Sequence, residues 1–280
     1  MRKLFKWFKR LFIYPIIALT LIIGTALIIT HFVTAPSNDR DWSLDQSVLP
    51  YAKINDNLVT IHNIRNFTYA STTSYTPDYY NKTFDVSKIK KVWYIVEPFS
   101  GFRGSAHTFL SFEFENETFI AVSIEIRKEK GESFSALKGL FNRYELMYVF
   151  ADERDAIKLR SNYRKDLVYV YPVKTTTEKA RALFLDMVKK ANELKDAPEF
   201  YNTAVNNCTT NIARHVNIIS PKRVPFVSLS FILPASSDKL AYDLGLIDTD
   251  LSFEEARKKF LINDRAAQYA DDSAFSVKIR

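Results

Sequence analysis

An unbroken apolar segment near the N-terminus constrains this chain more than any other feature. Residues 13–33 (IYPIIALTLIIGTALIITHFV) contain no Asp, Glu, Lys or Arg. As a helix, this segment spans roughly 30 Å at about 1.5 Å per residue, which is the thickness of a bilayer core. We therefore predict one N-terminal transmembrane helix over residues 13–33.

The basic residues before this segment predict its orientation. Residues 1–12 hold five Lys and Arg and no acid, so the positive-inside rule keeps this end in the cytoplasm and places the remaining chain outside. A cleaved signal peptide is the alternative, with a cut after Ala35. However, Pro36 would follow the cut, and the apolar run is longer than a usual signal. We expect a single-pass cell-membrane anchor that is not cleaved, with the following domain on the periplasmic, extracytoplasmic side.

The net charge of +7 does not predict nucleic-acid binding. Without residues 1–12, 34 basic residues stand against 32 acidic ones, a net charge of +2. This distribution shows no stripe of basic residues that could bind along a phosphate backbone. The membrane is the expected partner, and nucleic acid is not.

The pattern beyond the anchor predicts one α+β domain, with a mainly antiparallel sheet packed on helices. Residues 34–57, with Pro36 and Pro50, indicate a linker, and residues 58–280 indicate the extracytoplasmic domain. Strands are expected over 58–69, 92–98, 106–115, 118–126, 146–150 and 167–173, with a loop over 70–83. Helices are expected over 132–145, 153–162, 177–194 and 207–218, with short helices from 238 onward.

The segment 106–126 predicts a hairpin that places His107 opposite Glu125. A tight loop over 115–117 pairs Phe112 with Ile120 and Leu110 with Val122, so that apolar side chains meet on one face. Continuing this register brings the carboxylate beside the imidazole, where it can hold one tautomer. A slip of two residues would keep the faces and break this pair. The alternative is a surface histidine opposite a solvated acid.

Cys208 is the only cysteine, and it lies at the expected start of a helix. Asn206 or Asn207 is a good N-cap, which places the thiol in the first turn, where unpaired amides favour a thiolate and supply an oxyanion hole. The same Cys208 also follows the apolar spacing of Ile212 and Val216. A small buried core residue is therefore the alternative.

The positions of the four histidines help to decide between a reactive thiol and a buried core cysteine. His31 lies in the anchor, His215 is about 10 Å along the helix from the thiol, and His62 has no carboxylate patterned against it. His107 is the partner that is left. One thiol and so few histidines argue against a zinc site, and we expect neither a metal nor another cofactor.

Three motifs resemble a known family. His107 within AHTFLSF, Glu125 within SIEIR, and Cys208 within YNTAVNNCTTN resemble the bacterial envelope domain DUF4105, which is associated with lipoprotein N-acyltransferases. The resemblance covers roughly residues 60–235. The order, with a strand histidine before a helix cysteine, is also similar to circularly permuted NlpC/P60 (papain-like) enzymes, including the lecithin:retinol acyltransferase group.

The resemblance implies a permuted papain-like fold with Cys208 as the nucleophile, His107 as the base and Glu125 as the orienting group. It implies acyl transfer from a membrane phospholipid, through a Cys208 thioester, to the N-terminal amine of a lipoprotein. Substrate-binding roles are expected for Arg127, on a lipid phosphate or in a structural ion pair, and for Tyr201 and Asn207, which flank the thiol or serve in packing and capping. A papain-like hydrolase of cell-wall peptides and a non-catalytic envelope binding module with a buried thiol are the alternatives.

Overall fold

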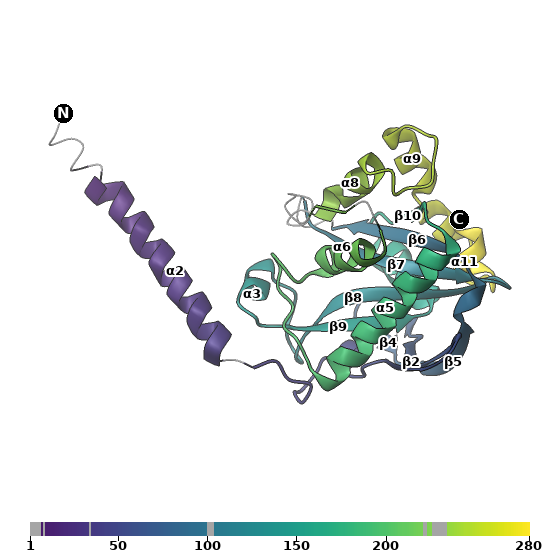
Figure 1. Cartoon of the computed structure of the whole chain (residues 1–280), viewed down its shortest axis with the longest axis horizontal. Coiled ribbons are helices and arrows are strands. Elements are labelled where there is room, and N and C mark those ends of the chain that lie inside the picture. Colours follow the sequence, from purple (N-terminus) through teal and green to yellow (C-terminus); the bar gives the residue numbers. More distant parts are fainter. Residues whose placement is uncertain (1–6, 8, 34, 100–103, 221–222, 226–233) are drawn as a thin grey trace.

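A long apolar helix begins the described part of the chain. The computed structural model describes residues 7, 9–33, 35–99, 104–220, 223–225 and 234–280. A π-helical turn, η1 (Lys9–Ile13), leads into α2 (Tyr14–Val33). Figure 1 shows α2 extending away from the rest of the protein. No residue between Lys9 and Ala26 is buried, so the apolar side chains of this stretch have no protein to cover them.

The bounds of α2 agree with the predicted span to within one residue. Among the described residues, this is the one helix long and apolar enough to cross a membrane by length and composition. The predicted cytoplasmic end over residues 1–12 is described in part only. Arg2, Lys3 and Lys6 lie outside the described residues.

One mixed sheet forms the centre of the domain after the anchor. Its strand order is β1-β2-β9-β8-β7-β6-β10, and β5 also pairs with β2. All neighbours are antiparallel except β2 and β9, which share one parallel pair. A separate ribbon consists of β3 and β4. The strands are β1 (Tyr51–Asn55), β2 (Leu58–Arg65), β3 (Thr68–Tyr69), β4 (Tyr75–Thr76), β5 (Tyr79–Asp85), β6 (Ile89–Pro98), β7 (Ala106–Phe114), β8 (Thr118–Arg127), β9 (Glu145–Ala151) and β10 (Tyr169–Pro172).

Helices cover both faces of this sheet. The helical elements are η2 (Leu44–Gln46), η3 (Val86–Lys88), α3 (Ala136–Leu140), α4 (Glu153–Lys158), η4 (Leu159–Arg164), α5 (Thr177–Asp196), α6 (Cys208–Ile219), η5 (Pro234–Ser236), α8 (Ser237–Asp243), α9 (Phe253–Phe260), α10 (Asn263–Gln268) and α11 (Phe275–Lys278). In Figure 1, α5 and α6 cross one face. The helices α4, α10 and α11 contribute buried residues to the second hydrophobic cluster, on the other face. The predicted α+β architecture, a sheet packed on helices, is confirmed.

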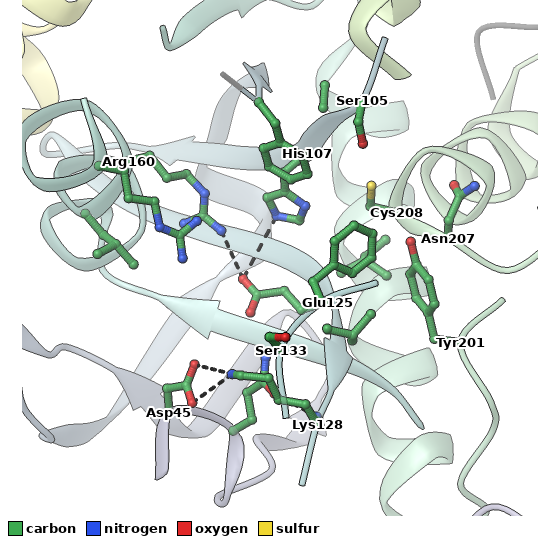
Figure 2. Close-up of a pocket in the computed structure, with 18 of the residues that line it drawn as sticks. Asp45, Ser105, His107, Glu125, Lys128, Ser133, Arg160, Tyr201, Asn207 and Cys208 are labelled. Carbon is green, nitrogen blue, oxygen red and sulfur yellow. Dashed lines mark hydrogen bonds and ion pairs between the residues drawn. The ribbon is translucent and has the colours of Figure 1, made fainter. Parts of the chain in front are cut away.

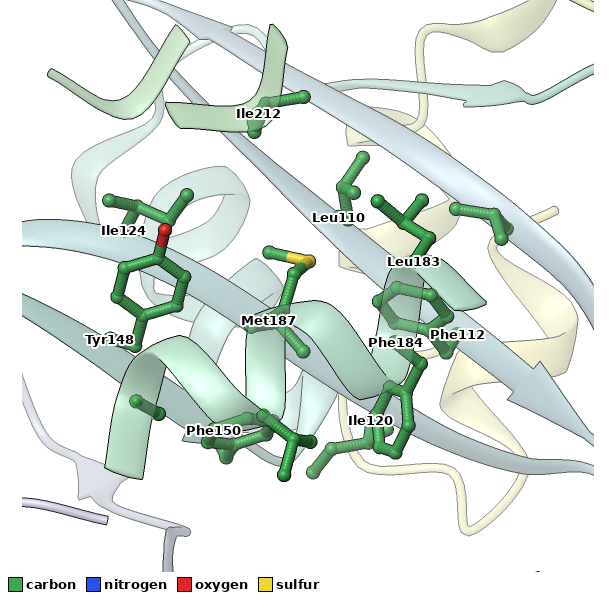
Figure 3. Packing of buried hydrophobic residues seen from close by; sticks show 14 of the residues in the cluster. Leu110, Phe112, Ile120, Ile124, Tyr148, Phe150, Leu183, Phe184, Met187 and Ile212 are labelled. Atoms are coloured by element: carbon green, nitrogen blue, oxygen red, sulfur yellow. The ribbon is translucent and has the colours of Figure 1, made fainter. Parts of the chain in front are cut away.

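Alternation along β7 divides the core into two layers. Leu110 and Phe112 point to the face covered by α5 and α6, whereas Phe109 points to the face covered by α4. On the first face the ring of Phe184, from α5, lies 4.9 Å from that of Phe112, and Figure 3 shows Met187 between the sheet and the helix. Burying each such side chain contributes roughly 2–3 kcal/mol. This packing fixes α5 and α6 on one side.

Two segments differ from the sequence prediction because local patterns were too weak. The predicted loop over 70–83 contains β4 and most of β5, whose Tyr75 and Tyr79 pack on the ring of Phe67. The predicted helix over 132–145 is reduced to the short α3. Tertiary contacts overrule propensity in both segments.

The predicted linker over 34–57 is wrong for most of its length. Residues 51–55 form β1, and residues 35–50, which we name the strap, pack on the domain. Trp42 forms a β-bridge with Glu129, and the Arg127 guanidinium lies 4.2 Å from the Trp42 ring. Arg127 also donates to the carbonyls of Gln46 and Ser47 and to Asn38 Oδ1 at 2.8–2.9 Å. The strap is therefore held at many points rather than free.

We predict that Arg127→Gln releases the strap. Arg127 is buried, and its charge satisfies three oxygens of the strap, so the substitution should lower the free energy of unfolding by about 3 kcal/mol. Trypsin should then cleave faster after Arg40. Urea unfolding and limited proteolysis of the full chain in detergent measure both effects. The exposed Lys130→Gln is the matched control, and equal behaviour of the two variants would contradict the role given to Arg127.

Candidate active site

Cys208 is the first residue of α6. The Asn207 side chain accepts a hydrogen bond from the Thr210 amide at 2.9 Å, and Thr210 Oγ1 accepts one from the Asn207 amide at 2.8 Å. This reciprocal cap fixes the first turn. The predicted N-cap and the predicted position of Cys208 are confirmed. The thiol thus lies where amide groups at a helix start stabilise negative charge.

The hairpin β7–β8 has the predicted register, but its ladder is shorter. Phe114, Phe112 and Leu110 pair with Thr118, Ile120 and Val122, as the sequence indicates. Pairing ends at Phe109 and Ser123. The predicted rung between His107 and Glu125 is therefore not formed.

Beyond Ser123 the two strands separate. β7 stays paired with β6 as far as Ala106, and β8 stays paired with β9 as far as Arg127. Residues 105–107 and residues 124–126 all line one cavity. Because neighbouring residues of a strand point to opposite faces, a cavity lined by consecutive residues reaches both faces. We name this opening the split.

The cavity in the split has a volume of about 430 Å³, which is within the range of small-molecule sites. Figure 2 shows its charged wall and the wall that carries Cys208 and Tyr201. Charged side chains on it are Asp45, Arg65, Glu125, Lys128, Glu132, Arg160 and Arg164, and aromatic ones include Phe99, Phe134 and Tyr201. The cavity therefore offers one polar and one more apolar surface.

A serine joins His107 to Glu125. His107 Nε2 lies 2.7 Å from Ser123 Oγ, and Ser123 Oγ donates to Glu125 Oε1 at 2.8 Å. The direct distance from Nε2 to Glu125 Oε1 is 4.0 Å. Glu125 thus acts on the imidazole through Ser123. The predicted contact is corrected to an indirect one, because the strands have already separated at this level.

This chain of hydrogen bonds determines the tautomer of His107. A serine hydroxyl has one proton, and Ser123 gives it to Glu125. His107 Nε2 must then carry a proton and donate it to Ser123 Oγ, which leaves the lone pair on Nδ1. Among the described residues nothing hydrogen-bonds to Nδ1. The ring is therefore oriented, with its basic nitrogen available.

Two arginines hold Glu125 in its charged form. Burial alone would raise the pKa of Glu125, but the charges of Arg65 and Arg160 outweigh burial and hold that pKa well below its usual range. Arg160 Nη2 donates to Glu125 Oε1 at 3.1 Å, and Arg160 Nε donates to Glu97 at 2.6 Å. A bidentate pair at 3.0 Å with Asp155 positions Arg65. Each buried charge has a partner.

His107 is neutral at physiological pH. Burial, and then the charge of Arg160, lower the pKa of His107 to about 3, although Glu125 acts in the opposite direction. The ring also stacks on Phe109 with centroids 5.5 Å apart. A neutral imidazole is the form that can accept a proton.

His107 and Cys208 line the same cavity without touching in this state. Cys208 packs with Leu110 and Ile212 on the face of α6, whereas His107 points to the face of α4. The described residues contain no hydrogen bond between them, and the polar contact of the thiol is with Thr209, at 3.8 Å. Only the split allows the His107 imidazole and the Cys208 thiol to line the same cavity (Figure 2). Cys208 is both a core residue and a wall residue, with 6% of its surface exposed.

The three predicted substrate-binding residues have different outcomes. Arg127 does not line the cavity, because its side chain donates hydrogen bonds to the strap, and this favours the expected structural role over contact with a lipid phosphate. Tyr201 and Asn207 both line the cavity. Burial, with the nearby Cys208, raises the pKa of Tyr201, which is therefore an uncharged wall next to the thiol.

Sequence reasoning missed Ser123, Arg65 and Arg160 as parts of the site. Of the three, Ser123 was the easiest to predict from the sequence, because it shares a strand face with Glu125 and lies diagonally across from His107. Arg160 comes from the π-helical turn η4, and no sequence spacing connects it with β6 or β8. Only the packing of η4 on the sheet positions this guanidinium.

The remaining histidines of the domain lie elsewhere. His215 bonds to Tyr148 at 2.7 Å and to Asp186 at 2.6 Å, within the layer between α5, α6 and the sheet. His62 stacks on Tyr51. In the part of the chain that the structure describes, no three His, Cys, Asp or Glu side chains are grouped to hold a metal ion.

The fold and this cavity define an α+β domain with its one thiol on the wall of a cavity, and the comparisons identify its family. Residues 75–235 match the Lnb N-terminal periplasmic domain. The match covers more than half of the chain, which therefore belongs to this family. No curated protein and no solved structure matches the chain, so the likeness to DUF4105 and to permuted NlpC/P60 enzymes stays a prediction. A periplasmic domain after one apolar helix fits a single-pass membrane protein.

We predict that His107 makes the stability of the domain depend on pH. Below its ordinary pKa of 6.5 the unfolded side chain binds a proton that the folded one, with a pKa of about 3, does not bind. The contribution of His107 to the free energy of unfolding should therefore fall by about 2 kcal/mol from pH 6.5 to pH 5 and stay nearly level above pH 6.5. His215, whose pKa burial also lowers, adds a loss of the same sign.

His107→Gln keeps a polar side chain beside Ser123 and should reduce this pH dependence. Urea unfolding of the full chain at pH 7 and pH 5 measures the difference, with Lys130→Gln as the control. This window lies above the ordinary pKa of Glu125, 4.5, so the lowered pKa of that carboxyl does not contribute to the change. The same slope in both variants would show that folding does not lower the pKa of His107.

Proposed function

We propose that the domain is a thiol acyltransferase in which Cys208 is the nucleophile and His107 the base. One observation carries the proposal. The split between β7 and β8 opens a cavity onto both a thiol at a helix start and an oriented, neutral imidazole. These are the two groups that nucleophilic acyl transfer needs.

The first step forms a thioester. The Cys208 proton passes to Nδ1 of His107 after rotation of the thiol or through one water molecule, and Sγ attacks the carbonyl carbon of an ester. Amides of the first turn of α6 stabilise the oxyanion. The carbon–oxygen bond then breaks, and the imidazolium returns its proton to the leaving alkoxide. The products are an acyl-Cys208 thioester and an alcohol, here a lysolipid.

The low pKa of His107 is compatible with this role because the reaction changes its surroundings. A thiolate beside Nδ1 is a negative charge that stabilises the imidazolium and raises the pKa of the ring. Glu125, reached through Ser123, remains charged on the opposite side. Proton transfer and the formation of the thiolate therefore occur together.

The second step transfers the acyl chain to an amine. The amine attacks the thioester carbonyl, His107 accepts a proton from it, and the carbon–sulfur bond breaks. The thiolate then recovers the proton from His107. The product is an amide, and no cofactor is consumed or needed.

We propose a phospholipid as the acyl donor and the N-terminal amine of a lipoprotein as the acceptor. The resemblance of the Cys208 and His107 motifs to lipoprotein N-acyltransferase domains supports this choice. Membership of a periplasmic domain family and an apolar N-terminal helix support it too, because both substrates are anchored in a bilayer. Arg65, Arg160 and Lys128 line the cavity but already pair with Asp155, Glu97 and Asp45, so the headgroup is not assigned to any of them.

We predict that the full chain forms an acyl adduct on Cys208 when mixed with phospholipid vesicles. Intact-mass spectrometry should show the added acyl mass, and hydroxylamine should remove it. Cys208→Ala should form none while unfolding like the parent. A diacylglyceryl-cysteine peptide should then receive the chain as an amide. Release of free fatty acid alone would identify a hydrolase, and the absence of any adduct would leave the binding-module alternative.

The reactivity of Cys208 should depend on His107 and, to a lesser extent, on Ser123. Iodoacetamide should alkylate the parent faster than His107→Gln, and acyl transfer should fall roughly 100-fold or more in that variant. Ser123→Ala should give an intermediate rate, because it breaks the link to Glu125 and leaves the imidazole in place. His62→Gln, outside the cavity, is the matched control. Equal alkylation rates in all four proteins would remove His107 from the mechanism.

A further inference from the structure

Large apolar side chains are exposed on and around α3. Leu137 is 65% exposed, Phe134 44% and Leu140 38%, and Val205, in the turn before α6, is 61% exposed. We name these four residues the α3 surface. Scattered exposed apolar residues are ordinary, but a group of them on adjoining segments marks an interaction site.

The domain holds α3 firmly enough to present this surface. Thr203 Oγ1 donates to the Ala136 carbonyl at 2.8 Å, and Asn202 donates to the Leu140 carbonyl at 3.4 Å. A Cβ on Gly139 would lie 2.3 Å from Thr203 Oγ1, so glycine allows this close approach. Five residues do not form a stable helix alone. These contacts keep Leu137 and Leu140 outside while the opposite side of α3 packs on the turn.

The α3 surface adjoins the rim of the cavity, and one of its residues, Phe134, belongs to both. Phe134 lines the cavity together with Ser133 and Ala136, and Thr203 and Cys208 line it from the adjoining turn and α6. Phe134 further contacts Phe99, with ring centroids 6.4 Å apart. A molecule that leaves an apolar phase through this surface would enter the space that contains the thiol.

The strap places this rim at the membrane end of the domain. Arg40 pairs with Glu129 at 3.0 Å and Glu145 at 2.9 Å, which lie before and after α3 in the chain, and it also donates to the Ala35 carbonyl. Ala35 follows Val33, the end of α2, by two residues, which span at most roughly 7 Å. Figure 1 shows α3 on the side of the domain from which the chain leads to α2.

We propose that the α3 surface inserts into the boundary between the headgroups and acyl chains of the bilayer that holds α2. A lipid surface is the occupant because the chain is anchored in it within a few residues of this rim. The inference goes beyond the proposed function, since insertion requires no chemistry at Cys208. If the proposed function holds, this surface is where the phospholipid passes from the bilayer to the thiol.

Site-specific fluorescence in proteoliposomes tests the insertion. The full chain with Cys208→Ser and Leu137→Cys carries one label at position 137, in vesicles of phosphatidylethanolamine and phosphatidylglycerol. The control carries it at Leu58→Cys, which is 47% exposed and begins β2 seven residues before Arg65, roughly 23 Å from the cavity along the strand. Thermal unfolding shows that both variants fold.

The label at 137 should shift to shorter wavelength and be quenched by lipids brominated on their acyl chains, whereas the label at 58 should show neither effect. Equal responses at the two positions would overturn the proposal. A shift at 137 without lipid quenching would also overturn it, in favour of contact with a second copy. Neither readout needs turnover, so a failure of the proposed function leaves this test intact.

A second variant connects the surface with the substrate. Leu137→Asp, with Cys208 present, should slow acylation from vesicle phospholipid and leave acylation from a short-chain, monomeric ester unchanged. Leu58→Asp should alter neither rate. An equal loss with both donors would show damage to the site rather than to docking, and an unchanged rate with vesicles would contradict the proposal.

Discussion

The ion pairs of Arg160 are the interaction on which the site depends. Its guanidinium bonds to Glu97 on β6 at 2.6 Å and to Glu125 on β8 at 3.1 Å, and so reaches across β7, which lies between them. Where β7 and β8 separate, backbone hydrogen bonds no longer join them, and this buried guanidinium supplies a connection instead. A buried cation between two carboxylates is stable only if all three stay in place. These ion pairs therefore stabilise the geometry of the split.

The split resolves a conflict between the two catalytic candidates. A histidine on one face of a sheet and a cysteine in a helix on the other face are normally separated by the sheet itself. In this domain the end of the β7–β8 ladder at Phe109 and Ser123 removes that barrier, and His107 and Cys208 line one cavity. The same opening inserts Ser123 between His107 and Glu125, which determines the tautomer that the proposed mechanism requires.

The strap attaches the chain after α2 to the domain at several points. A flexible linker would let the domain turn freely above the membrane, whereas Trp42, Arg127 and Arg40 attach the segment after α2 to the sheet and to the residues around α3. Ala35, two residues after the end of α2, is thus connected through Arg40 to the residues that lie before and after α3.

The sequence by itself determined the long apolar helix, the hairpin register and the N-terminal position of Cys208 in its helix, because each depends on local patterns: an apolar run, strict alternation, and a capping residue at the right spacing. Only the tertiary structure decided where the ladder ends, that Arg127 binds the strap rather than the cavity, and that Arg160 joins the site. Strand parity is a property of two consecutive residues, but the separation of two strands depends on what packs between and behind them. The sequence therefore named the two candidate catalytic groups, and packing alone decided that they share one cavity.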